Sequence, residues 1–196
     1  GYLRACYDLC HQKNVLFIAD EIQTGIGRTG KLLACDYEGI RPDILILGKA
    51  LSGGVSQVSA VLADDEIMLT IAPGEHGSTY GGNPLAAKVA IAALEVVRDE
   101  HLSENAFKMG ELFRGEMERI NNPMIKKVRG KGLLNAVVTE PKDGKTAWDI
   151  CLALKENGLI AKPTHDHIIR FTPPLVITEE QMMEAIGIIR DTFAKF

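Results

Sequence analysis

The sequence has few cysteines, no excess of basic residues and no long apolar run, and each shortage excludes a class of protein. Its 196 residues include only four cysteines, too few for a disulfide-stapled scaffold. The 22 Lys and Arg face 26 Asp and Glu, a net charge of −4, so the composition predicts no nucleic-acid partner. No apolar run approaches the ~20 residues that span a bilayer, so we expect no membrane partner.

What remains is typical of a globular protein, with 46% hydrophobic and 24% charged residues. A chain of this length predicts one to two domains. A helical pattern is already running at Tyr2, so we expect a fragment that lacks its N-terminal part. The targeting end would lie in that part, which leaves mitochondrial matrix and cytoplasm both open as the compartment.

Apolar spacing predicts a helix over residues 2–13 and a short helix over 31–38. The continuous apolar runs at 15–22 and 44–47 predict two strands buried on both faces of a parallel sheet. A third run, at 59–63, follows so closely that we expect an antiparallel strand there.

The ends of the first two predicted strands carry the residues of greatest chemical interest. About twenty residues separate the two runs, which is enough for a parallel crossover. Asp20 and Lys49 would then lie at the same edge of the sheet. Ligands of open α/β sheets bind at that edge.

The second half of the chain has a different composition, and we place a domain boundary between residues 98 and 99. Before it, Asn83 and Pro84 predict the start of a helix that runs to residue 97. Beyond it we expect a small α+β domain. Its predicted elements are an amphipathic helix over 99–119, a strand over 125–138, a helix over 146–157, strands over 159–161 and 168–171, and a helix over 179–196.

An apolar strand ending in Asp, followed by one ending in Gly-Lys, is an arrangement that pyridoxal phosphate (PLP) enzymes use. The lysine anchors the cofactor covalently and moves protons, while the acid keeps the pyridine nitrogen protonated. From Asp20 and Lys49 alone, a loop-capping Asp and a solvated Lys explain the pattern equally well.

Three segments together resemble the class-III (ω-) aminotransferases in sequence, order and separation. They are DEIQTG with GRTG over 20–30, PDI followed by LGKALSGG over 42–54, and HGSTYGGNPLA over 76–86. The resemblance implies an α/β fold-type I PLP enzyme. Residues 1–98 would be the C-terminal part of its PLP-binding large domain, with a mainly parallel sheet, and residues 99–196 its small C-terminal α+β domain.

The resemblance also implies roles for individual residues around PLP. Lys49 would be the catalytic lysine that holds the cofactor, and Asp20 would pair with the pyridine nitrogen. Gln23 would hydrogen-bond the phenolic oxygen of the ring, and Ile22 would pack against the ring face.

Further roles implied by the resemblance concern phosphate and substrate. Ser78 and Thr79 would be cofactor contacts, with Thr79 reaching the PLP of a neighbouring subunit, which implies a homodimer. Arg170 would bind the α-carboxylate of the amino acid or 2-oxo acid substrate, since a guanidinium binds a carboxylate through two hydrogen bonds. The histidines lack the spacing of metal ligands, so we expect no metal.

Within the family, two further regions resemble the branch that transfers the δ-amino group of ornithine to 2-oxoglutarate. They are VRGKGLLNA over 128–136, and AKPTH over 161–165 followed by IIRFTPPL over 168–175. The alternatives are the branches acting on acetylornithine or 4-aminobutyrate, and a truncated remnant without activity. The missing N-terminal half would hold the Gly-rich phosphate turn and the aromatic residue stacked on PLP.

Overall fold

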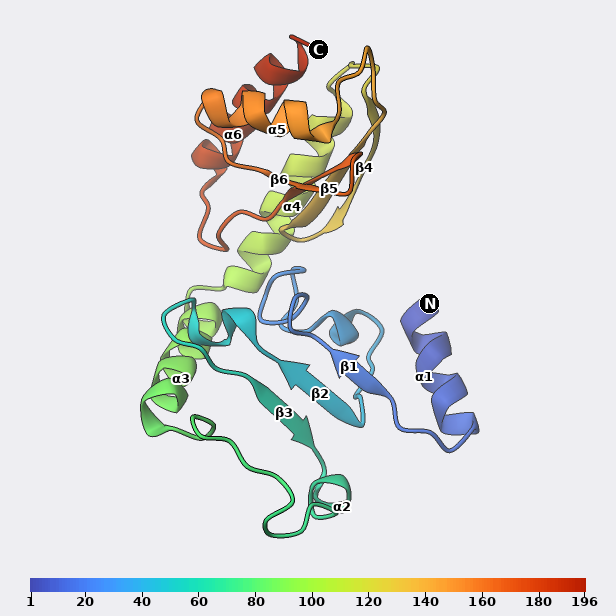
Figure 1. Cartoon of the computed structure of the whole chain (residues 1–196), viewed down its shortest axis with the longest axis vertical. Helices are drawn as coiled ribbons and strands as arrows, with labels where there is room; N and C mark the ends of the chain where they lie inside the picture. Colours follow the sequence, from blue (N-terminus) through green and yellow to red (C-terminus); the bar gives the residue numbers. More distant parts are fainter. The chain divides into compact units, whose positions relative to one another are not determined.

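The computed structural model describes residues 1–196 and divides them into two units, Gly1–Leu102 and Ser103–Phe196 (Figure 1). No helix in it has both the length and the apolar character needed to cross a membrane. Each unit has its own sheet, and the first has two hydrophobic clusters where the second has one.

A three-stranded mixed sheet organises the first unit. Its strands β1 (Ile18–Asp20), β2 (Ile44–Leu47) and β3 (Ala60–Ala63) lie in that order. The pairing of β1 with β2 is parallel and that of β2 with β3 is antiparallel, which confirms both predicted directions. The helices of this unit are α1 (Tyr2–Gln12), η1 (Ala34–Tyr37), η2 (Lys49–Ser52), α2 (Asp65–Met68) and α3 (Pro84–Asp99).

The structure corrects several expectations for this sheet. Its first strand is three residues long rather than covering 15–22, and Ile18 is 54% exposed. All four residues of β2 are only half-buried, so the prediction of strands buried on both faces is wrong. One of its two pairings is antiparallel, so these three strands form a mixed sheet. A 3₁₀ turn, η1, replaces the short helix expected over 31–38.

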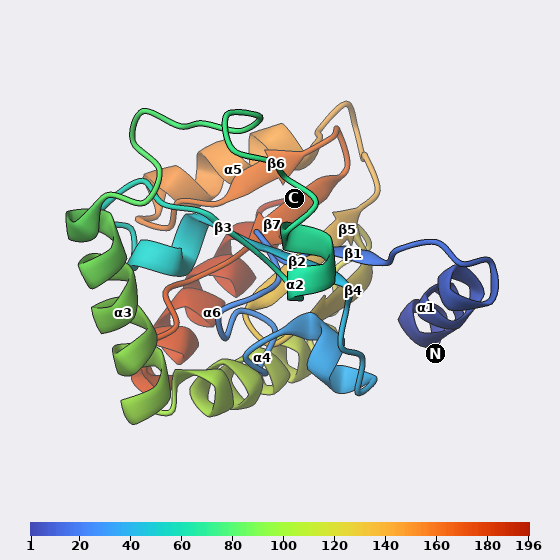
Figure 2. The same ribbon diagram turned by 90° about the horizontal axis from the view of Figure 1, so that it is seen from below.

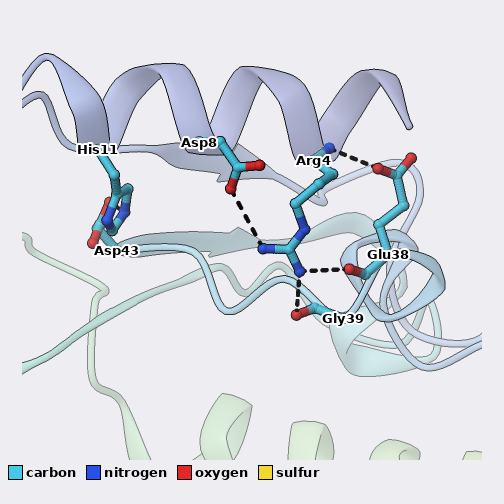
Figure 3. Close-up of polar contacts among 6 residues, drawn as sticks. All are labelled: Arg4, Asp8, His11, Glu38, Gly39 and Asp43. Atoms are coloured by element: carbon cyan, nitrogen blue, oxygen red, sulfur yellow. Dashed lines mark hydrogen bonds and ion pairs between the residues drawn. The ribbon is translucent and has the colours of Figure 1, made fainter.

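Polar contacts attach α1 to the segment that follows η1 (Figure 3). The Arg4 guanidinium donates to the carbonyls of Glu38 and Gly39, at 2.6 and 2.8 Å. The backbone N–H of Arg4 also donates to the Glu38 carboxylate at 2.6 Å. The hydrogen bond from the Arg4 backbone N–H is the main cause that lowers the pKa of the Glu38 carboxyl. The apolar side of α1 packs against Phe17 and Ala19.

Asp43 joins the start of β2 to the residue before β1. Its carboxylate accepts a hydrogen bond from the backbone N–H of Phe17 at 2.7 Å. The same carboxylate lies 3.1 Å from His11 Nε2, and Figure 3 shows these two side chains together. The Phe17 carbonyl accepts in return from the N–H groups of Asp43 and Ile44. This double connection fixes the parallel register of the two strands.

The helix α3 begins as the sequence predicts. The Asn83 side chain accepts from the N–H of Ala86 at 2.8 Å, and Pro84 occupies the first helical position. Capping of this kind satisfies a donor that the first turn leaves unpaired. Small residues, Ala86 and Ala90, form the buried side of the helix.

The second unit is a four-stranded antiparallel sheet with helices on one face. Its strands β4 (Ile125–Lys131), β5 (Leu134–Thr139), β7 (Ile168–Phe171) and β6 (Lys162–Thr164) lie in that order (Figure 2). Val137, Ile169 and Phe171 point into a core shared with the helices. The helices are α4 (Leu102–Glu118), α5 (Ala147–Glu156) and α6 (Glu179–Phe193).

Two expectations about these strands are wrong. The region 125–138 is a hairpin of β4 and β5 rather than one strand, because the chain turns at Gly132, whose φ is +53°. The strand expected over 159–161 lies instead at Lys162–Thr164, where the backbone pairs with β7. The structure confirms the strand at Ile168–Phe171. It also confirms the capping box that Thr178 forms with Gln181.

Two glycines on α4 give a matched test of packing in this unit. A Cβ at Gly110 would lie 1.9 Å from the carbonyl oxygen of Gly132, whereas one at Gly115 would meet nothing within 4 Å. We expect Gly110→Ala to destabilise the protein by at least ~2 kcal/mol, because the backbone of the β4–β5 turn must move. Gly115→Ala should stabilise it by ~0.5–1 kcal/mol through helix propensity. Urea unfolding of both variants measures this, and equal effects would contradict the packing described.

Candidate active site

The parallel pairing of β1 with β2 brings Asp20 and the Lys49 backbone to one edge of the sheet. Asp20 lies opposite Ile46 in the register, and β2 ends at Leu47, two residues before Lys49. Lys49 has a φ of +47°, a left-handed conformation that is uncommon outside glycine. Strained backbone of this kind is often found at functional sites.

Asp20 has free hydrogen-bonding capacity at this edge. One of its oxygens accepts from the backbone N–H of Ile22 at 3.1 Å, and the carboxylate is exposed. Lys49 is exposed as well, and its amine has no hydrogen bond or ion pair within the chain. Both groups are therefore available to a ligand.

The two other residues expected here lie in the turn after β1. Ile22 is half-buried and packs against Gly48, where an added Cβ would be 3.5 Å from two of its side-chain carbons. Gln23 is exposed, and its amide has no partner within the chain. The structure thus brings Ile22 to the residue preceding Lys49 and leaves Gln23 free to bind.

Sequence reasoning missed Glu21, which holds this turn in place. Only 3% of Glu21 is exposed. Its carboxylate accepts from the backbone N–H of Cys35 at 2.8 Å and from the hydroxyl of Thr24. Burial of a charged group requires such partners. An acidic residue immediately after an apolar strand was the available signal.

A cavity of about 1050 Å³ lies beside Lys49 in the first unit. Ser78 and the α3 cap Asn83 line it together with Lys49. The Ser78 hydroxyl accepts from the N–H of Gly81 at 2.8 Å, which leaves its proton free to donate. Thr79 is exposed, has no partner within the chain and does not line this cavity.

Arg170 belongs to the second unit. It is the third residue of β7, is half-buried, and has no hydrogen bond or ion pair within the chain. With Lys162 it lines a separate cavity of about 520 Å³ whose other walls are mainly apolar. A guanidinium without an intramolecular partner is suited to a carboxylate ligand.

The groups around Lys49 fit PLP by their chemistry. A primary amine can bond to the cofactor's aldehyde, and the open carboxylate of Asp20 can accept from a protonated ring nitrogen. The amide of Gln23 can donate to the phenolic oxygen, and the side chain of Ile22 offers an apolar surface to the ring. The chain therefore offers PLP an amine, an amide and a carboxylate that keeps free capacity to accept hydrogen bonds.

The family model for class-III aminotransferases matches residues 1–193, and the chain belongs to this family. Enzymes of this family use PLP. Among curated proteins, the mitochondrial ornithine aminotransferase of Drosophila melanogaster is 64% identical over 98% of this chain and 44% of its own length. The mitochondrial ornithine aminotransferase of Rattus norvegicus is 59% identical over 100% of this chain and 45% of its own length. The chain thus spans less than half the length of these relatives.

Solved structures give the same fold. An acetylornithine aminotransferase from Elizabethkingia anophelis superposes with a TM-score of 0.96 at 62% identity, over 100% of this chain and 50% of its own. The ornithine aminotransferase of Toxoplasma gondii ME49 also superposes with a TM-score of 0.96. It is 48% identical, and the match covers 100% of this chain and 47% of its own. The α/β class-III fold with mixed sheets is therefore confirmed.

The environment of Glu21 predicts unequal cysteine reactivity. Burial, together with the neighbouring Glu21 carboxylate, raises the pKa of the Cys35 thiol to about 12, and burial raises that of Cys151 to about 11. Because the thiolate is the nucleophile, both should stay protonated and unreactive at pH 8. We expect iodoacetamide to label the half-buried Cys6 and Cys10 at least ~10-fold faster, as measured by peptide mass spectrometry. Equal labelling of Cys35 in the folded protein would refute this environment.

Proposed function

We propose that this chain is part of an enzyme that moves the δ-amino group of L-ornithine to 2-oxoglutarate. The products would be glutamate 5-semialdehyde, which cyclises to pyrroline-5-carboxylate, and glutamate. The observation that carries the proposal is 56–64% identity to ornithine aminotransferases from animals, fungi and a plant over nearly the whole chain. The AKPTH segment, with Arg170 on the neighbouring strand, supports the same branch.

A second candidate is the transamination of acetylornithine. It is favoured by one observation, the 62% identity to the acetylornithine aminotransferase from Elizabethkingia anophelis. Ornithine and acetylornithine differ in the charge of one amino group, so the two activities demand different charges in the substrate pocket.

PLP, when bound, supplies an aldehyde that bonds to amines and a ring that withdraws electrons from the reacting carbon. The Asp20 carboxylate would hold the proton on the ring nitrogen, and Gln23 would donate to the phenolic oxygen. Ile22 would pack against the ring and exclude water from it. These are the roles that their free polar atoms and their apolar surface support.

Lys49 is the catalytic base in this proposal. Its amine anchors the cofactor at rest and, once released, takes the proton from the δ-carbon of ornithine. Arg170 binds a substrate carboxylate through paired hydrogen bonds. Both side chains lack partners within the chain, which supports these roles.

The remaining assignments concern the intact protein. In our proposal residues 1–98 belong to the PLP-binding large domain, with its mainly parallel sheet completed by other parts of the protein, and residues 99–196 form the small domain. The protein is a homodimer in which Ser78 and Thr79 contact cofactor phosphate, Thr79 that of the partner subunit. The enzyme acts in the mitochondrial matrix or the cytoplasm, since some of the relatives are named as mitochondrial and others are not.

Competing amino donors test the substrate directly. The full-length protein is supplied with PLP, 2-oxoglutarate and either ornithine, acetylornithine or 4-aminobutyrate, and glutamate formation is followed. We expect kcat/KM for ornithine to exceed the other two at least ~100-fold, as hydrogen-bonded sites discriminate strongly. Comparable values for acetylornithine would overturn the ornithine assignment and favour the second candidate.

Replacement of the lysine tests the mechanism. In the full-length protein, Lys49→Ala should lower kcat by at least ~10³-fold, because both the anchor and the proton-transfer group are lost. Lys88→Ala, which removes an exposed lysine of α3, is the matched control and should leave kcat within about twofold of the wild type. A Lys49→Ala enzyme with the wild-type rate would rule out Lys49 as the base.

A further inference from the structure

The AKPTH segment over 161–165 lies beside Arg170. Its strand β6 pairs antiparallel with β7, and the register places Lys162 directly opposite Arg170. Directly opposed residues of an antiparallel pair share one face, with Cβ atoms ~4.5–5.5 Å apart. Lys162 and Arg170 are therefore cross-strand neighbours.

The face that they share is the one turned away from the core. Along β7, Ile169 and Phe171 are buried, whereas Ile168 and Arg170 alternate with them. The same register row continues from Arg170 to Ala136 on β5 and Arg129 on β4. Three cations, and no acidic residue, thus occupy one row across the sheet.

No anion within the chain offsets this charge. Lys162, Arg129 and Arg170 have neither a hydrogen bond nor an ion pair from their side chains. Glu184 lines the same cavity as Lys162 and Arg170 but forms no ion pair with them. Like charges opposed across two strands destabilise the sheet, and a bound anion would remove that cost.

We infer that Lys162 determines specificity for the acceptor substrate by binding a carboxylate beside Arg170. This inference rests on the proposed function. Two neighbouring cations favour 2-oxoglutarate, which carries two carboxylates and no ammonium group. They favour ornithine less, because it carries two ammonium groups and one carboxylate. Lys162 therefore strengthens the binding of the acceptor in preference to the donor.

The kinetic test uses the full-length, PLP-loaded enzyme with Lys162→Met, which keeps the apolar stem of the side chain and removes the charge. We expect kcat/KM for 2-oxoglutarate to fall about tenfold and kcat/KM for ornithine to change less than about twofold. Lys127→Met is the matched control, because it removes an exposed cation of the same sheet that lies opposite Val138 rather than Arg170. It should alter neither value more than about twofold.

A binding measurement tests the same inference without catalysis. Glutarate is an unreactive five-carbon dicarboxylate. It should raise the Tm of the wild-type protein above the Tm measured in sodium chloride of equal ionic strength. The increase in Tm should be smaller for Lys162→Met. Without glutarate, Lys162→Met should be at least as stable as the wild type, because the like-charge pair is gone.

Three results would overturn the inference: equal effects of Lys162→Met and Lys127→Met, equal losses of kcat/KM for both substrates, or a marked fall in the Tm of unliganded Lys162→Met. The proposed function fails separately, if the wild-type enzyme does not use ornithine. In that case the glutarate measurement still decides whether Lys162 binds a dicarboxylate.

Discussion

The parallel pairing of β1 with β2 is the constraint on which the chemistry of the first unit depends. It aligns the carboxyl ends of two strands that are remote in sequence, so that Asp20 and the lysine after β2 lie at one sheet edge. The Asp43 carboxylate and the Phe17 carbonyl fix the register at the opposite end of the strands. Buried Glu21 then holds the turn that carries Ile22 and Gln23. A slip of one residue in this register would turn the side chains of one strand to the other face of the sheet.

The second unit follows a different principle, since its sheet separates an apolar face from a charged one. Helices α4, α5 and α6 cover the side of Val137 and Ile169. The opposite side presents cations in a single row, among them Arg170. Rigid strands hold those cations at fixed spacing, which suits the recognition of a carboxylate better than a flexible loop would.

The sequence predicted most of the helices and the direction of all three strands in the first unit. Those features depend on local signals, such as the Asn83-Pro84 cap and the apolar runs. The roles of the residues near Lys49 stay predictions. Burial of β1 and β2 was predicted wrongly, because a continuous apolar run does not say which other elements cover the strand. The β4–β5 hairpin was missed, although Gly132 lies at the turn and glycine is typical of turns. The pairing of Lys162 with Arg170 depends on tertiary register, which no local pattern encodes.

The central claim is that Lys49 is the residue that holds PLP. Borohydride reduction of the full-length, PLP-loaded protein fixes any covalent link between cofactor and lysine as a stable secondary amine. Peptide mass spectrometry then locates the pyridoxyl group. We predict that it lies on the peptide containing Lys49 and on no other. A pyridoxyl group on a different lysine, or an unmodified Lys49 in the loaded protein, would contradict the claim.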